Sequence, residues 1–83
     1  MYVIIVYDVE EKRVGKVLKF LRKYLNWVQN SVFEGELSDG KFKDLQMGLK
    51  KILKKEEDSV LFYKLRTEKD FEKEVMGVEK SRI

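Results

Sequence analysis

One acidic residue, Asp8, stands at the end of the most apolar run in the chain. It follows Tyr2, Ile4 and Val6 at two-residue spacing, so in a strand all four side chains would project from one face. A carboxylate at the end of a buried strand is costly unless it is paired or bound to a metal. Asp8 is therefore the best candidate for a metal ligand and catalytic residue. The simpler alternative is that it caps the following helix or interacts with the dipole of its first turn.

A second copy of the chain would give Asp8 a chemical role. If two chains met through this sheet face, two Asp8 carboxylates could approach each other across a two-fold axis. Bound Mg²⁺ or Mn²⁺ would relieve their repulsion and keep several waters. Such a cation lowers the pKa of a bound water and could generate a nucleophile without histidine. The 83 residues contain no histidine and no cysteine, which excludes disulfides, thiolate sites and Ser/His/Asp catalysis.

Basic residues after Asp8 offer contacts with a polyanion. Arg13 could hold a phosphate through two parallel hydrogen bonds, and Lys12 and Lys16 lie on the exposed helix face beside it. The alternative for these residues is ordinary solvated surface charge. Glu10 and Glu11 fit the first turn of a helix better than they fit a ligand set.

Aromatic residues on the predicted strands have two interpretations. Tyr7, Phe62 and Tyr63 could stack nucleic-acid bases, as sheet aromatics do in some RNA-binding modules. Packing in the core or across a dimer is the alternative.

The elements that must position these residues follow from hydrophobic spacing. Tyr2 to Tyr7 is β-branched and aromatic without a polar break, which predicts a strand buried on both faces. A helix follows, because apolar residues recur at helical spacing on one side and lysines on the other. The apolar stripe of this helix is Val14, Val17, Leu18, Leu21 and Leu25, and its basic face is Lys12, Lys16, Lys19 and Lys23.

The remainder of the chain predicts four further elements. Residues 27–29 and 32–37 form a hairpin around an Asn30-Ser31 turn. Ser38 or Asp39 caps a second helix, whose apolar residues are Phe42, Leu45, Leu49 and Ile52 and whose outer lysines are Lys43, Lys50, Lys51, Lys54 and Lys55. After the polar link Glu56-Glu57-Asp58, residues 59–65 form a strand, and residues 74–78 form a short final strand.

This order predicts a single α+β domain over residues 1–83, a ferredoxin-like βαββαβ two-layer sandwich with an extra C-terminal strand. Its two helices would cover one sheet face, yet the first strand is apolar on both sides. A second copy, packed face to face, is the simplest cover for the other face. The segment 66–83 could be exchanged between protomers and cap an open sheet edge.

Charge and composition narrow the class of protein. Residues 1–55 hold 12 Lys and Arg against 7 Asp and Glu, whereas residues 56–83 hold 6 against 8, so the basic excess lies in the front of the chain. The high charge content, with no proline, resembles proteins of hyperthermophiles. No targeting segment and no run of about 20 apolar residues appears, so we expect a soluble, cytoplasmic protein with no membrane partner.

Two motifs make the chain similar to a known family. The strand end Tyr7-Asp8, followed by a basic helix and then by the run Val28-Gln29 through Ser31-Val32-Phe33-Glu34, resembles the small CRISPR-associated adaptation proteins. These are the ferredoxin-like second member of the conserved CRISPR core pair. The match extends over essentially the whole chain in its order of elements.

The resemblance implies a homodimer with an exchanged terminal strand and a divalent cation, Mg²⁺ or Mn²⁺, held by Asp8 of both chains. It implies a metal-dependent endonuclease on RNA or duplex DNA that works in spacer acquisition. The alternative within the family is a non-catalytic scaffold that binds duplex DNA and bridges CRISPR integrase dimers. Lys12 and Arg13 are the nearest matches to a basic residue of the site, and Tyr7, Ser31 and Phe33 are implied to border the cleft. A dimeric nucleic-acid-binding module without a CRISPR role is the third interpretation.

Overall fold

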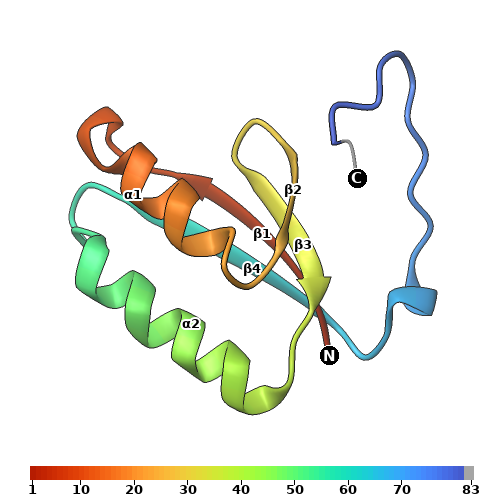
Figure 1. Ribbon diagram of the computed structural model, residues 1–83, viewed down its shortest axis with the longest axis horizontal. Coiled ribbons are helices and arrows are strands. Elements are labelled where there is room, and N and C mark those ends of the chain that lie inside the picture. The colour runs from red at the N-terminus through yellow and green to blue at the C-terminus, as the bar shows by residue number, and fades with distance from the viewer. Residues whose placement is uncertain (82–83) are drawn as a thin grey trace.

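The elements of the protein follow the predicted order over the region before residue 66. The computed structural model describes residues 1–81. Its elements are β1 (Tyr2–Asp8), α1 (Glu11–Leu21), β2 (Asn26–Gln29), β3 (Val32–Glu36), α2 (Asp39–Ile52), β4 (Ser59–Leu65) and a short 3₁₀ helix, η1 (Glu68–Asp70). The strands form one antiparallel sheet in the order β2-β3-β1-β4, and both helices lie against one side of it (Figure 1).

Local sequence signals explain where these elements begin and end. The Ser38 side chain accepts a hydrogen bond from the Lys41 N–H at 3.1 Å, which confirms a Ser38 cap for α2. Asn30 has a φ of 44° in the turn between β2 and β3, a left-handed conformation that asparagine tolerates. The predicted two-residue turn of the hairpin is therefore confirmed. Helix α1 ends at Leu21, although Leu25 beyond it still contributes to the apolar core.

The core lies between the sheet and the helix layer. Its residues on β1 are Val3, Ile5 and Tyr7, which alternate with residues of the other face. The helices close the core with Val17 and Leu21 from α1 and with Phe42, Leu45 and Leu49 from α2. One face of the sheet is thus filled by its own chain.

The other sheet face is apolar but covered in part only. Leu61 pairs with Val6 and Tyr63 with Ile4, so these four side chains share the face opposite the helices. Leu61 is 51% exposed and Tyr63 is 55% exposed. An apolar strand face without a covering layer agrees with the prediction that a second surface packs there.

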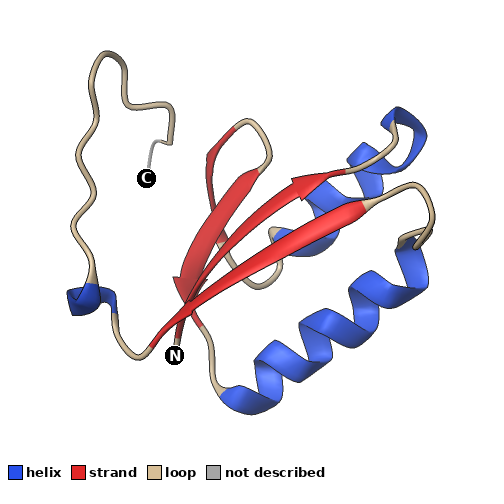
Figure 2. Cartoon of the chain, turned by 180° about the vertical axis from the view of Figure 1, so that it is seen from behind, coloured by secondary structure: helices blue, strands red, loops and turns tan. Residues whose placement is uncertain are grey.

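The C-terminal segment differs from the prediction. Beyond Leu65 the described residues form η1 and an extended path but no strand, so the strand expected at residues 74–78 is not formed within this chain. The segment stands on the side of the sheet away from both helices (Figure 2). It is held by Phe71, whose ring lies 5.3 Å from that of Tyr2, and by an ion pair of 2.7 Å between Lys73 and Glu34. Exchange of this segment between protomers stays a prediction, with residues 82–83 outside the described chain.

Candidate functional site

Asp8 lies where the sequence predicts it, at the end of β1 on the face opposite the core. It is exposed, and it pairs in register with Ser59, the first residue of β4. Because Tyr7 before it points into the core, the pleat turns the Asp8 side chain to the face of Ile4 and Val6. Asp8 therefore places a carboxylate at the rim of the partly covered apolar face.

The alternative that Asp8 caps α1 is contradicted. The N-cap position of α1 is Glu10, and no side chain makes the capping hydrogen bond. The acidic residue of the first turn is Glu11, as predicted. Asp8 therefore does not cap α1, and its interaction with the helix dipole stays a prediction.

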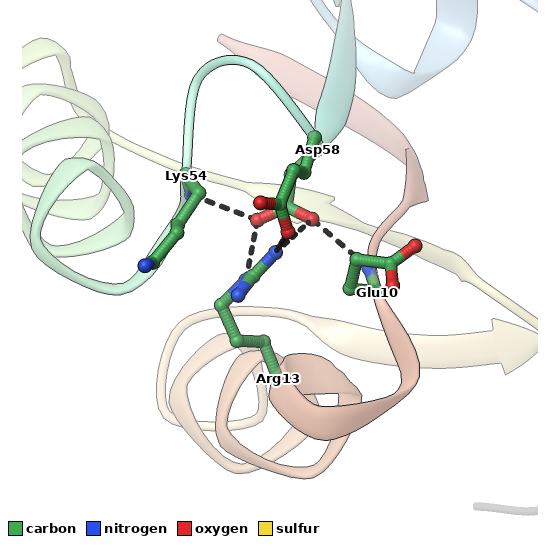
Figure 3. A network of polar contacts seen from close by, with 5 residues as sticks. Glu10, Arg13, Lys54 and Asp58 are labelled. Carbon is green, nitrogen blue, oxygen red and sulfur yellow. Dashed lines mark hydrogen bonds and ion pairs between the residues drawn. The ribbon is translucent and has the colours of Figure 1, made fainter.

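A network around Asp58 lies directly beside this strand end (Figure 3). Arg13 donates to Asp58 from Nε at 2.7 Å and from Nη2 at 3.0 Å, and Nη2 also donates to Glu57 at 2.8 Å. The Asp58 carboxylate further accepts the backbone N–H of Glu10 at 2.9 Å and that of Lys54 at 2.8 Å. Four donated hydrogen bonds therefore meet on one carboxylate whose side chain is 0% exposed.

These contacts hold two acids of the loop, Glu57 and Asp58, ionised. The guanidinium of Arg13, together with the two backbone N–H groups, holds the pKa of Asp58 far below its usual value of 3.8. The hydrogen bond from Arg13 likewise lowers the pKa of Glu57. In turn, the two carboxylates raise the pKa of Arg13, which keeps its charge although its side chain is only 8% exposed.

The prediction that Arg13 contacts nucleic acid is therefore wrong. Its side chain donates to Asp58 and Glu57 and is only 8% exposed. Asp58 lies in a segment that the sequence predicts only as a polar link, so its role as the partner of Arg13 is not predicted. No spacing signal identifies this pair, because 45 residues separate Arg13 from Asp58.

Two of the three residues predicted to border the cleft are in the core. Phe33 is 0% exposed and Tyr7 is 4% exposed, and their rings stack at 6.2 Å under the helices. The prediction for both is wrong, because the pleat directs Tyr7 and Phe33 to the helix face of the sheet. Burial raises the pKa of the Tyr7 phenol, so it stays protonated. Ser31 is half-buried and accepts the Tyr7 N–H through its carbonyl at 3.1 Å, and its place at a cleft stays a prediction.

The aromatic residues of β4 divide in the same way. Phe62 packs edge to face on Phe42 at 5.4 Å in the helix layer, so it is not open to a base. Tyr63 lies on the open face. Lys12 and Lys16 are exposed on α1 and remain predicted contacts for an anion.

One chain offers a cation few ligands. Within residues 1–81, no three Asp, Glu, His or Cys side chains gather as a metal site. Mg²⁺ is usually held by one or two carboxylates with water completing its shell, and the exposed Asp8 carboxylate has the chemistry of one such ligand. Across the same described range, no helix is long and apolar enough to cross a membrane.

Comparisons with known proteins are consistent over the whole chain. The family model described as "CRISPR associated protein Cas2" matches residues 1–73. A Thermotoga maritima protein named "CRISPR-associated endoribonuclease Cas2" is 58% identical over 80 residues, covering 96% of this chain and 92% of that protein.

Solved structures agree with these matches. One described as "Crystal structure of cas2" is similar with a TM-score of 0.89 at 51% identity, covering 100% of this chain and 93% of the other. The structure of Streptococcus pyogenes Cas2 at pH 6.5 has a TM-score of 0.82 at 34% identity, covering 93% and 100% of the two chains.

The Asp58 network predicts a specific acid dependence of stability. The folded-state pKa of Asp58 is lower than that of the unfolded chain, so its contribution is complete above about pH 5. It is lost as the pH falls through 3.8 toward the folded-state pKa, because the unfolded chain binds the proton first. Asp58→Asn should melt about 10 °C below the wild type at pH 7, and this gap should narrow toward pH 2.

Thermal melts from pH 7 to pH 2 measure this gap. Glu56→Gln is the matched control, because it removes an exposed carboxylate from the same loop, and it should follow the wild type. A gap that keeps its size at every pH would contradict the assignment of the ionised Asp58 as the stabilising group.

Proposed function

The chain belongs to the CRISPR associated protein Cas2 family, and from this membership we propose that it is a divalent-metal-dependent endonuclease of CRISPR spacer acquisition. RNA is the favoured substrate, since relatives at about half identity or more carry the name endoribonuclease. The observation that carries the proposal is the exposed Asp8 carboxylate beside an apolar sheet face.

The proposed active unit is a homodimer. Ile4, Val6, Leu61 and Tyr63 form an apolar patch that one chain covers in part only. Packing this patch on its symmetric copy would remove apolar surface from water. It would also bring the Asp8 carboxylates of the two chains to the same interface. Each chain then contributes one carboxylate to a shared site.

The cation of this site is proposed as Mg²⁺ or Mn²⁺, held by Asp8 of both chains. When bound, it supplies Lewis-acid stabilisation of the charge that develops on the phosphodiester. The protein itself supplies an anionic group at a fixed strand end and lysines that attract the nucleic-acid backbone. The sequence contains no histidine, so no imidazole is available as a general base.

A second function is favoured by the distribution of lysines. Lys16, Lys19 and Lys23 on or after α1 and the lysines at the end of α2 are all exposed. These helices lie side by side and could follow a duplex backbone without cutting it (Figure 1). In this alternative the dimer is a scaffold that holds duplex DNA and bridges subunits of the CRISPR integrase.

The nuclease proposal predicts that Asp8→Ala abolishes cleavage of single-stranded RNA in Mg²⁺ or Mn²⁺. The expected loss is at least about 100-fold, because the variant removes the cation ligand of each chain. Asp44→Ala, which removes an exposed carboxylate from α2, is the control and should retain activity. Labelled RNA and duplex DNA are followed with each cation and with EDTA. Equal cutting by wild type and Asp8→Ala would reject the role of Asp8.

The dimer proposal predicts that Leu61→Glu produces monomers. A charge in the centre of the apolar patch would have to be buried without a partner in the dimer. Met47→Glu is the matched control, since Met47 is 60% exposed on α2, away from the patch. Sedimentation should give twice the chain mass of 10.0 kDa for wild type and for Met47→Glu, and the chain mass for Leu61→Glu. A wild-type monomer, or a Leu61→Glu dimer, would exclude this interface.

The scaffold alternative predicts duplex binding that weakens steeply with salt and survives Asp8→Ala. Lys16→Gln/Lys19→Gln removes four lysines from the dimer and should reduce the slope of log Kd against log salt by up to about 4, because each phosphate contact contributes about 0.9. Lys69→Gln/Lys80→Gln makes the same change of charge in the C-terminal segment and should keep the slope. Fluorescence anisotropy between low and physiological salt measures both. An equal slope for the two double variants would remove the helix face from the proposed DNA site.

A further inference from the structure

Asp58 contacts the backbone two residues after Asp8, and none of its hydrogen bonds within the described residues includes Asp8. Its Oδ1 accepts the N–H of Glu10, two residues after Asp8, at 2.9 Å. Ser59, the next residue after Asp58, is the register partner of Asp8 in the β1–β4 ladder. The backbone around Asp8 is therefore held by two adjacent residues, Asp58 at the end of the loop and Ser59 at the start of β4.

Arg13 completes this arrangement from the first turn of α1. Its backbone N–H donates to the Glu10 carbonyl at 2.8 Å, while its side chain forms two hydrogen bonds to Asp58. The short path from β1 to α1, residues 9–10, is thus closed into a ring by Asp58. The side chain of the N-cap residue Glu10 does not cap helix α1. This ring of hydrogen bonds therefore fixes the direction in which the helix begins.

The loop that carries Asp58 is itself fixed. Asp58 accepts the Lys54 N–H at 2.8 Å and donates its own N–H to the Lys54 carbonyl at 2.8 Å. Lys54 lies two residues after Ile52, the last residue of α2, so the position of Asp58 is tied to the helix layer. In contrast, the Asp8 side chain is exposed and none of the described hydrogen bonds or ion pairs includes it.

We infer that Arg13 and Asp58 are positioning residues for Asp8: they hold the β1 end and the following turn so that the exposed carboxylate has one direction. The inference rests on the proposed function, in which two such carboxylates must meet one cation. A fixed backbone matters there, because a displacement of about 1 Å in a catalytic group can cost up to about 100-fold in rate. Because Arg13 bonds to Asp58 and Asp58 bonds to Arg13 and to backbone N–H groups, we expect their loss to lower turnover and to leave binding unchanged.

The test is Asp58→Asn in the full-length protein, which keeps the shape of the side chain and removes its charge. We expect kcat for RNA cleavage to fall at least about tenfold, with KM and the Kd for RNA unchanged within about twofold. Arg13→Lys, which keeps the charge but not the paired hydrogen bonds, should retain more activity than Arg13→Gln.

A control separates positioning from general loss of stability. Leu45→Ala creates a cavity in the core at a fully buried site on α2, and it is compared at a temperature where all variants are folded. It should keep wild-type kcat. If Leu45→Ala loses kcat as Asp58→Asn does, or if Asp58→Asn keeps kcat, the positioning role is rejected.

Hydrogen exchange distinguishes this inference from the proposed function. In Asp58→Asn, exchange at the Glu10 amide and its neighbour Val9 should rise at least about tenfold, while amides in the centre of β1 stay protected. Should the wild type show no Asp8-dependent cleavage, the proposed nuclease would fail, and exchange alone would decide the inference. Faster exchange confined to residues 9–10 then supports positioning, and unchanged exchange overturns it.

Discussion

The ion pair between Arg13 and Asp58 is the interaction on which the arrangement of this small domain depends. It joins the first turn of α1 to the loop between α2 and β4, and its partners are 45 positions apart in the sequence. A buried charge is costly without a partner, but here every strong donor around Asp58 is directed at its carboxylate. The pair therefore selects one relative position for β1, β4 and both helices, in a chain that has no disulfide to do so.

The pleat of β1 directs alternate side chains to the two faces of the sheet, and these faces have different roles. Residues on one side of the strand fill the core under the helices, and those on the other side form the apolar patch that ends in Asp8. A short chain has little core, so an uncovered apolar strand face is a strong reason to associate. In the proposed dimer, the interface and the candidate site use the same surface, so each would depend on the other.

The protein uses its charges in two separate ways. Arg13 donates its hydrogen bonds to Glu57 and Asp58, so the role of these three residues is structural. The lysines of α1 and α2 remain exposed and available to an anionic partner. A nuclease and a DNA scaffold would both use these lysines, and they differ in whether Asp8 takes part in a reaction.

The sequence by itself determined the features that depend on local periodicity. The two-residue repeat of β1 predicted the side on which Asp8 lies, and Asn30 and Ser38 marked the hairpin turn and the helix cap. Only the tertiary structure decided which face of the sheet the helices cover, and this placed Tyr7 and Phe33 in the core. It also decided the role of Arg13, because a basic residue on a helix has the same local pattern whether it meets a phosphate or an aspartate. Asp58 comes close to Arg13 only when β4 pairs with β1, and no short-range spacing in the sequence indicates this contact.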